Sequence, residues 1–192
     1  MNAGFVRPAR SHDADAIVSV ALAAWRNLPW LSLDEDSNVV DAVRADWQSL
    51  LGRTTSQAPA TSTAPADADS ASAIAPVPDA AVLVATQSDD VLVGWLLLGA
   101  PEDGFPGGVC EVLDVVVAPS SQRQGHGSRL MHAAADTARE RGVAWLSAWC
   151  PLPDEARRAF LLAHGFAPDG AVRDLLGGDA PDQQPGATSR NT

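Results

Sequence analysis

Apolar residues change their spacing several times along the chain, and each change marks the boundary of an expected element. Between Ser11 and Asn27 they recur every three or four residues, the period of a helix with one buried face. Between 109 and 117 they form an almost continuous run, which is typical of a buried strand. Over the whole chain, this pattern predicts strands at about 5–7, 81–85, 91–98, 109–117, 143–150 and 166–176, and helices at about 11–27, 36–51, 128–141 and 153–165.

The expected elements follow one another as strand, two helices, three strands, helix, strand, helix and strand. Ser88, Asp89 and Asp90 join two apolar runs as a hairpin turn would, which places antiparallel pairing in the first half. A helix then lies between the strands at 109–117 and 143–150, the arrangement of a parallel crossover. The pattern therefore predicts a mixed α/β protein.

Two segments lack the apolar residues that a core requires. Residues 52–79 are almost wholly Ala, Pro, Ser, Thr and Asp, with Ile74 as the single large aliphatic before Val77. This composition buries too little surface to offset the entropy of ordering, so a disordered insertion is predicted. Residues 177–192 are polar and rich in Gly and Pro, which predicts a flexible tail. The interpretation is a single domain within residues 1–176.

Composition and charge exclude several function classes. Of the 192 residues, 46% are hydrophobic and 19% are charged, which suits a globular protein. The formal net charge of -11 argues against general nucleic-acid binding, which needs a basic surface. Neither a run of ~18 apolar residues nor an export signal in residues 1–10 is present, so we expect a cytoplasmic protein without membrane contact. The four histidines lack metal-ligand spacing, and no metal is predicted.

The loop from Gln122 to Gly127 is the clearest candidate for ligand binding. Gly125 and Gly127 remove two side chains where the first N–H groups of a helix lack partners within that helix. These groups, the helix dipole and Arg123 together favour an anion such as a diphosphate, although two glycines also fit a plain turn. Leu130 replaces the third glycine of a dinucleotide-binding motif, and no Gly-Lys-Ser/Thr follows, so those two nucleotide motifs are excluded.

The wider sequence around this loop resembles a known motif. Residues 113–119 read Leu-Asp-Val-Val-Val-Ala-Pro, and the pattern Gln122-x-x-Gly125-x-Gly127 and an amphipathic helix follow. This order resembles the acetyl-CoA-binding motif of the GNAT superfamily of N-acetyltransferases. Residues 156–166, which end in His-Gly-Phe, resemble the second motif of that family. The resemblance extends to residues 6–9 and 24–26, which are similar to the beginning of many bacterial members.

The resemblance implies a fold and a way of binding acetyl-CoA. The expected architecture is a central, mostly antiparallel twisted sheet with helices on both faces and one splayed parallel pair, here 109–117 and 143–150. The pantetheine arm would lie in the gap of that pair, against backbone groups of Val115 and Val117. Asp154 occupies a position where the family commonly has asparagine, and it also suits a helix cap. The amides of residues 123–128 would hold the diphosphate. The loop residues expected to bind the cofactor are Gln122, Arg123, Gln124, Gly125, His126, Gly127 and Ser128.

Two acidic residues are candidates for the catalytic base, because an amine must lose its proton to attack an acetyl group. Glu111 lies eleven residues before Gln122 and matches the catalytic glutamate of the superfamily's histone acetyltransferases. Asp114 is the second candidate. Side chains alternate along a strand, so the two face opposite sides unless a β-bulge intervenes, as is common in this strand of the family. A Glu111 that faces solvent or pairs with an arginine is the alternative.

The usual general acid of the family has no counterpart in this chain. That acid is a tyrosine in the helix before Gly-Phe, and the corresponding residue is Leu161. The chain contains no tyrosine at all, so this role cannot be transferred from the family. Either the thiolate leaves unaided or through water, or another group assists it, or catalysis is weak.

The acceptor pocket is expected near the segment that joins the first two helices. Trp25 and Trp30 lie there, close to the acidic residues 34–36, and Glu111 would face the same pocket. Aromatic walls with nearby acids suit a cationic amine. Core tryptophans beside a solvated acidic helix start are the alternative interpretation.

We therefore expect an N-acetyltransferase that moves acetyl from acetyl-CoA to a primary amine by direct attack in a ternary complex. The acceptor would be a small molecule or a peptide or protein amine, and the enzyme a monomer or homodimer. A non-catalytic module that binds or senses acyl-CoA is the alternative, since the tyrosine is missing.

Overall fold

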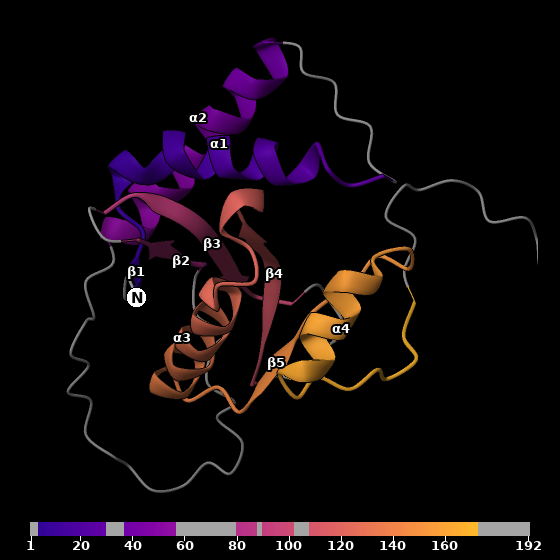
Figure 1. Ribbon diagram of the computed structural model, residues 1–192. Helices are drawn as coiled ribbons and strands as arrows, with labels where there is room; N and C mark the ends of the chain where they lie inside the picture. Colours follow the sequence, from indigo (N-terminus) through magenta and orange to yellow (C-terminus); the bar gives the residue numbers. More distant parts are fainter. Residues whose placement is uncertain (1–3, 30–36, 57–79, 88–89, 102–107, 173–192) are drawn as a thin grey trace, which may run out of the picture.

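The computed structural model describes residues 4–29, 37–56, 80–87, 90–101 and 108–172. They form a five-stranded mixed sheet with helices on both faces (Figure 1), which confirms the predicted fold class. In chain order the elements are β1 (Phe5–Pro8), the 3₁₀ turn η1 (Ser11–Asp13), α1 (Ala14–Trp25), α2 (Ser37–Ser56), β2 (Ala81–Thr86), β3 (Leu92–Gly99), β4 (Val109–Val117), the 3₁₀ turn η2 (Pro119–Ser121), α3 (His126–Glu140), β5 (Trp145–Ser147) and α4 (Glu155–Ala163).

The strands lie across the sheet in sequence order, from β1 to β5. Adjacent strands from β1 to β4 are antiparallel, whereas β4 and β5 are parallel. Helix α3 connects these last two strands. The parallel register covers only Val109↔Trp145, Cys110↔Leu146 and Glu111↔Ser147. Beyond Glu111, β4 therefore has no strand partner on that side within the described part of the chain, and a gap opens between the two strands.

Helices α1 and α2 cover one face of the sheet. Ile17 and Ala21 of α1 are fully buried there, at the helical spacing that the sequence shows. From α2, Leu51 is fully buried, and the ring of Trp47 meets Trp95 of β3 edge-on with 4.9 Å between centroids. Such an aromatic pair contributes about 0.5–1.5 kcal/mol beyond burial of its area, so it fastens α2 to the middle of the sheet.

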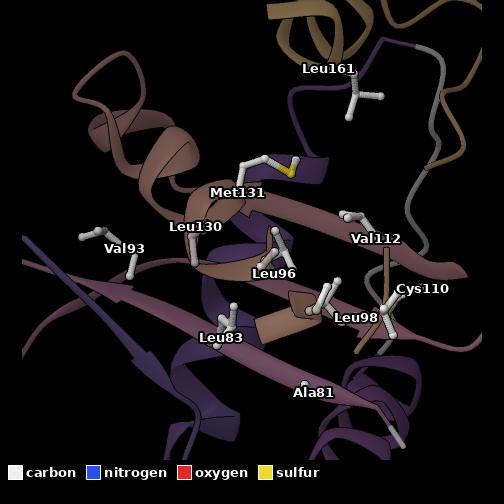
Figure 2. Close-up of a cluster of buried hydrophobic side chains, with 14 residues drawn as sticks. Ala81, Leu83, Val93, Leu96, Leu98, Cys110, Val112, Leu130, Met131 and Leu161 are labelled. Carbon is white, nitrogen blue, oxygen red and sulfur yellow. The ribbon is translucent and has the colours of Figure 1, made fainter. Parts of the chain in front are cut away.

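Helices α3 and α4 cover the opposite face (Figures 1 and 2). Leu130, Ala134 and Ala138 repeat every four residues along α3 and are buried in one cluster with Leu96 of β3. Leu161 of α4 belongs to the same cluster. Truncating a fully buried leucine costs about 2–5 kcal/mol. The contacts therefore hold α3 firmly, so its first turn is a rigid support for a binding site.

One extra residue in β4 changes which side chains share a face. Across β3 and β4 the partners are Leu97↔Asp114, Leu98↔Val112 and Gly99↔Glu111, which leaves Leu113 unpaired as a β-bulge. Glu111 and Asp114 stand opposite β3 residues of the same face, the one that α1 and α2 cover. The bulge thus brings both acidic candidates to one side of the sheet.

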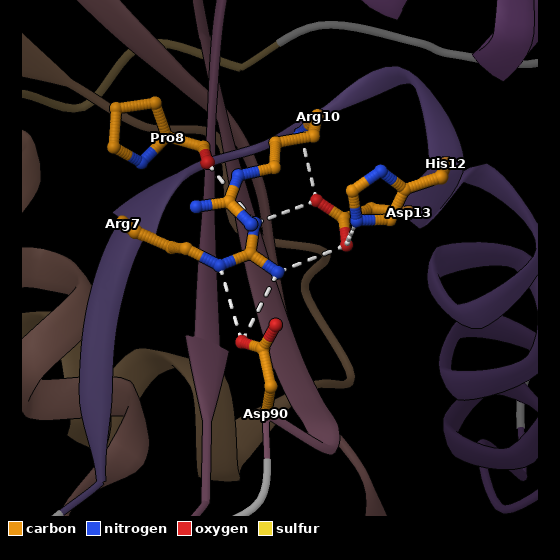
Figure 3. Close-up of polar contacts among 6 residues, drawn as sticks. All are labelled: Arg7, Pro8, Arg10, His12, Asp13 and Asp90. Atoms are coloured by element: carbon orange, nitrogen blue, oxygen red, sulfur yellow. Dashed lines mark hydrogen bonds and ion pairs between the residues drawn. The ribbon is translucent and has the colours of Figure 1, made fainter.

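An ion pair fastens β1 to the start of α1 (Figure 3). Two guanidinium nitrogens of Arg7 donate to the two carboxylate oxygens of Asp13 at 2.7 and 3.1 Å. The N–H of Arg10 donates to the same carboxylate at 2.7 Å, and Arg7 also reaches Asp90 after β2 at 3.4 Å. Burial raises the pKa of Asp13, but the hydrogen bonds from Arg7 and Arg10 outweigh it and hold that pKa below its ordinary value.

Helix α2 is longer than the sequence predicted, because it continues to Ser56. The predicted insertion at 52–79 therefore begins with a helical segment. Extending an existing helix fixes one residue for each new hydrogen bond, so even polar residues continue a helix that Leu51 anchors. The rest of the predicted insertion, residues 57–79, and the predicted tail at 177–192 lie outside the described residues.

The end of the sheet also differs from the prediction. Strand β5 has three residues where eight were expected, since its pairing with β4 ends at Ser147. Residues 166–172 form no strand, although a last strand was predicted at 166–176. Pro168 lacks an N–H group and Gly170 has φ 84°, and both features oppose regular strand pairing. Residues 173–176 lie outside the described residues.

No helix in the described ranges is both long enough and apolar enough to cross a membrane.

Candidate active site

A cavity of about 620 Å³ opens where β4 separates from β5. Its walls come from four places in the fold: the end of α1, the carboxyl half of β4, the loop and first turn of α3, and the first two turns of α4. The lining residues are Ala24, Trp25, Leu28, Asp114, Val115, Val116, Val117, Ser121, Gln122, Arg123, Gly125, His126, Gly127, Ser128, Asp154, Ala156, Arg157 and Phe160. The cavity therefore joins the predicted diphosphate loop to the predicted acceptor region.

The loop before α3 presents backbone N–H groups to this cavity. Arg123 and Gly125 both have left-handed backbones, with φ 61° and 81°. The first hydrogen bond of the helix runs from the N–H of Arg129 to the carbonyl oxygen of Gly125 at 3.1 Å. The N–H groups of the preceding helical residues thus have no acceptor within the helix. This cradle at a positive helix end fits a diphosphate.

Gly127 is required by close packing rather than by its backbone angles. A Cβ atom at this position would lie 3.1 Å from Cε2 of Phe160 on α4. The missing side chain lets α4 approach the first turn of α3, and both residues line the cavity. Since a side chain here would press on Phe160, the glycine of the motif keeps the shape of the cavity.

The ring of His126, one of the loop residues expected to bind the cofactor, is buried. The residue is 3% exposed, and its Nδ1 lies 3.0 Å from Nη2 of Arg129. Burial lowers the pKa of His126, and the positive charge of Arg129 lowers it further. A neutral ring accepts the hydrogen bond from Arg129. The side chain therefore holds an arginine beside the helix terminus.

Two backbone groups on the open edge of β4 are hydrogen-bonded to side chains of the protein itself. The N–H of Val115 donates to Oδ1 of Asp114 at 2.8 Å. The carbonyl oxygen of Val117 accepts from Nε2 of Gln122 at 3.2 Å. These are the two β4 residues expected to bind the pantetheine arm. Their hydrogen-bonding groups are thus accessible from the gap, and an extended amide-containing ligand fits there once the two side chains move.

The two acidic candidates differ in their access to the cavity. Glu111 is 1% exposed and does not line the cavity, because it lies where β4 and β5 are still paired. Asp114 lines the cavity, and its side chain is 24% exposed. Its Oδ1 is 2.6 Å from Nη1 of Arg157 on α4. The structure thus places Asp114, rather than Glu111, at the surface of the cavity.

Helix α4 begins with a side-chain cap at the edge of the cavity. Asp154 accepts a hydrogen bond from the N–H of Arg157 at 2.9 Å, so it is the helix cap that the sequence allowed. It also lines the cavity, at the position where the resemblance expects a ligand contact. Leu161, at the position of the family's tyrosine, is buried in the core.

Several cavity residues were not anticipated from the sequence. Trp25, a candidate for the acceptor pocket, lines the cavity together with Ala24 and Leu28, whereas Trp30 lies outside the described residues. Arg157 and Phe160 line it from α4. Arg157 precedes Leu161 by one helical turn, so the two residues share a face of the helix. This spacing is the signal in the sequence that could have placed Arg157 near the site. In the part of the chain that the structure describes, no three His, Cys, Asp or Glu side chains form a potential metal site.

Comparison with known families identifies this arrangement. Residues 41–166, more than half of the chain, match the model of the acetyltransferase (GNAT) family. No curated protein sequence matches the chain.

Solved structures with a similar fold include several N-acetyltransferases. The PaiA N-acetyltransferase of Thermoplasma acidophilum in complex with coenzyme A has a TM-score of 0.63 and 15% identity, over 86% of this chain and 90% of that one. Aminoglycoside N-acetyltransferase AAC(6')-Iy in complex with CoA has a TM-score of 0.63 and 16% identity, over 91% and 94%. The aminoglycoside 6'-N-acetyltransferase AAC(6')-Ih from Acinetobacter baumannii has a TM-score of 0.62 and 13% identity, over 90% and 97%.

At these identities the structural likeness is one of fold, and the match to the family model identifies the family. The expected enzyme class and acyl donor agree with both findings. The chain belongs to the acetyltransferase (GNAT) family and is an acetyl-CoA-dependent acyltransferase.

Proposed function

We propose that this enzyme transfers the acetyl group of acetyl-CoA to a primary amine by direct attack in a ternary complex. The carrying observation is one continuous cavity that runs from the N–H cradle of α3, along the open edge of β4, to Asp114 and Trp25. A donor and an acceptor would enter from its two ends and meet beside Asp114.

The donor end of the cavity would be held by backbone groups. The N–H groups at residues 123–128 would bind the diphosphate, with Arg123 adding positive charge. Val115 and Val117 would pair with the pantetheine arm after Asp114 and Gln122 release their backbone groups. Asp154 would contact the arm from the start of α4. Acetyl-CoA supplies the activated acetyl group when it is bound.

The acceptor end of the cavity lies between the end of α1 and β4. Trp25 and Leu28 form its wall, and Asp114 supplies a carboxylate. An aromatic wall with a carboxylate suits the ammonium form of an amine, whose proton Asp114 would then accept. Solved GNAT-fold structures bind such acceptors, since AAC(6')-Iy is in complex with an acetylneamine bisubstrate analog and meta-AAC0020 with sisomicin. A small-molecule or peptide amine and a cytoplasmic location are part of this proposal.

The roles of the two acidic residues are separable by mutation. Glu111 was the first candidate from the sequence, but its burial outside the cavity favours Asp114 as the proton acceptor. We expect Asp114→Asn to lower kcat about 100-fold or more while CoA affinity changes little. Release of free thiol from acetyl-CoA, measured with a panel of amines, gives kcat, and calorimetry gives the CoA affinity.

Glu111→Gln is the matched comparison, because it removes the other carboxylate of the same strand face. Normal turnover in Asp114→Asn together with loss in Glu111→Gln would assign the base to Glu111 instead. The alternative expectation, a non-catalytic acyl-CoA-binding module, is disfavoured by the match to the acetyltransferase family. That function requires CoA binding in calorimetry without thiol release above background for any amine or peptide.

A further inference from the structure

The reactive end of the cavity contains one cationic side chain among its lining residues. Arg123 and His126 lie at the loop and first turn of α3, beside the expected diphosphate. Arg157 instead lies next to Asp114, near the point where β4 and β5 part. Asp114 is three residues before Val117 along β4, or about 10 Å at ~3.3 Å per residue. Arg157 is therefore placed where an arm that starts at α3 and follows β4 would end.

Two contacts fix the position of Arg157. Its backbone N–H donates to the Asp154 cap at 2.9 Å, and its Nη1 donates to Asp114 at 2.6 Å. The side chain is only 18% exposed. Its Nε atom is buried and has no hydrogen-bond partner among the described residues. The guanidinium is thus held at the cavity wall, with hydrogen-bonding capacity that Asp114 does not use.

A thioester that loses its acyl group leaves a thiolate, and this chain has no tyrosine to protonate it. Leu161, one helical turn after Arg157 on the same face of α4, is an apolar core residue. An arginine cannot supply the proton, because a guanidinium stays protonated in proteins. It does provide a fixed positive charge, and an opposite charge within about 4–6 Å shifts a pKa by ~1–3 units toward the ionised form.

We propose that Arg157 stabilises the departing CoA thiolate, so that this enzyme uses electrostatic stabilisation where a proton donor would otherwise be needed. The inference rests on the acetyl transfer proposed above. In the transfer, the amine nitrogen forms a bond to the acetyl carbon, and the C–S bond breaks with its electron pair remaining on sulfur. The proton of the nitrogen passes to Asp114 and then to solvent. Arg157 keeps all of its protons.

The test measures the pKa of the thiol of bound CoA, which does not require turnover. Ultraviolet absorbance of the thiolate is followed against pH for CoA bound to the wild type, Arg157→Gln and Arg157→Lys. We expect the bound thiol to titrate at least ~1 pH unit below free CoA in the wild type. Arg157→Lys should retain most of this shift, because it keeps the charge, and Arg157→Gln should lose it. Equal thiol pKa values in wild type and Arg157→Gln would overturn the inference.

A second pair of variants controls for the unpaired Asp114 carboxylate that Arg157→Gln creates. Arg157→Gln leaves Asp114 without its partner in a partly buried site, and this change can itself disturb folding. Asp114→Asn and the double variant Asp114→Asn/Arg157→Gln are therefore compared with each other. The single variant should keep the lowered thiol pKa, and the double variant should lose it. The same thiol pKa in both would again overturn the inference.

Calorimetry with CoA distinguishes a failure of the proposed function from a failure of the role given to Arg157. If CoA does not bind the wild type, the proposed function fails and this inference fails with it. If CoA binds and thiol is released with an amine, but the thiol pKa is independent of Arg157, only the role of Arg157 is wrong. A pH–rate profile adds a kinetic measurement, since Arg157→Gln should move the acidic limb of turnover to higher pH while Arg157→Lys restores it.

Discussion

His126 occupies the first position of α3, with its ring buried against Arg129. Desolvation and the neighbouring arginine lower the pKa of this ring, so the folded protein favours its neutral form. The unfolded chain gains a proton at His126 as the pH falls through about 6.5, whereas the folded protein does not. Stability from this residue is therefore present above that pH and is lost below it.

We expect His126→Gln to weaken the acid dependence of stability, because an amide oxygen still accepts from Arg129 but does not titrate. The thermal midpoint of the wild type should fall between about pH 7.5 and about pH 5.5, and that of the variant should fall less. Differential scanning calorimetry of both proteins at each pH measures this. The other three histidines are common to both proteins, so an identical fall would exclude His126 as the cause.

Gly127 gives a second prediction at the scale of one residue. A β-branched side chain at this position meets Phe160, whose ring is 3.1 Å from the site of a Cβ atom. Gly127→Val should therefore raise the Kd for CoA about 10-fold or more, equivalent to about 1.4 kcal/mol, as measured by calorimetry. Gly52→Val is the control, since its Cβ would meet nothing within 4 Å and α2 is remote from the cavity lining. Equal CoA affinities in the two variants would contradict this packing role.

Among the elements, those with a local signal were predictable and those that depend on pairing were not. The run at Val109–Val117 became β4 with the predicted ends, and the glycines at 125 and 127 lie at the start of α3. The lengths of β5 and of the last predicted strand depend on neighbouring strands, which a single sequence does not show. For the same reason Arg157 and Phe160 were missed, because they join the site only after α4 packs beside β4.

The link between β1 and α1 gives a prediction about stability. Asp13→Asn should lower the free energy of unfolding by about 1–3 kcal/mol, because Arg7 then loses its charged partner in a partly buried site. Urea denaturation measures the change. The folded pKa of Asp13 is lowered, so its contribution is present above about pH 3.9 and is lost as the pH falls through the folded value.

Asp136→Asn is the control for this change, since its pair with Arg139 lies on the exposed surface of α3. Exposed pairs contribute about 0–1 kcal/mol. If the two variants lost equal stability, the ion pair between β1 and α1 would have no special structural role.

At the scale of the whole molecule, the cavity is lined by residues from the helices on both faces of the sheet. Trp25 and Leu28 belong to the α1 side of the sheet, whereas the cradle and Phe160 belong to the α3 and α4 side. A ligand that bridges the two should stabilise the entire fold. We expect CoA at about 100 times its Kd to stabilise the protein by about 2.7 kcal/mol. The rise in thermal midpoint checks this, and Gly127→Val at the same CoA concentration should show a smaller rise.

The bulge at Leu113 has a consequence for insertions and deletions. Before it, even-numbered residues of β4 face α3, and after it odd-numbered residues do, so the strand changes phase by one residue. Removing Leu113 would restore simple alternation without turning the strand over, because Val112 and Asp114 already stand opposite the consecutive β3 residues Leu98 and Leu97. Asp114 and Val116 would keep the side of α1 and α2, and Val115 and Val117 would keep the side of α3. A single deleted codon at the bulge would thus preserve the polarity of the site, whereas the same deletion at a paired residue of β4 beyond the bulge would reverse the faces of the residues that follow it in the strand.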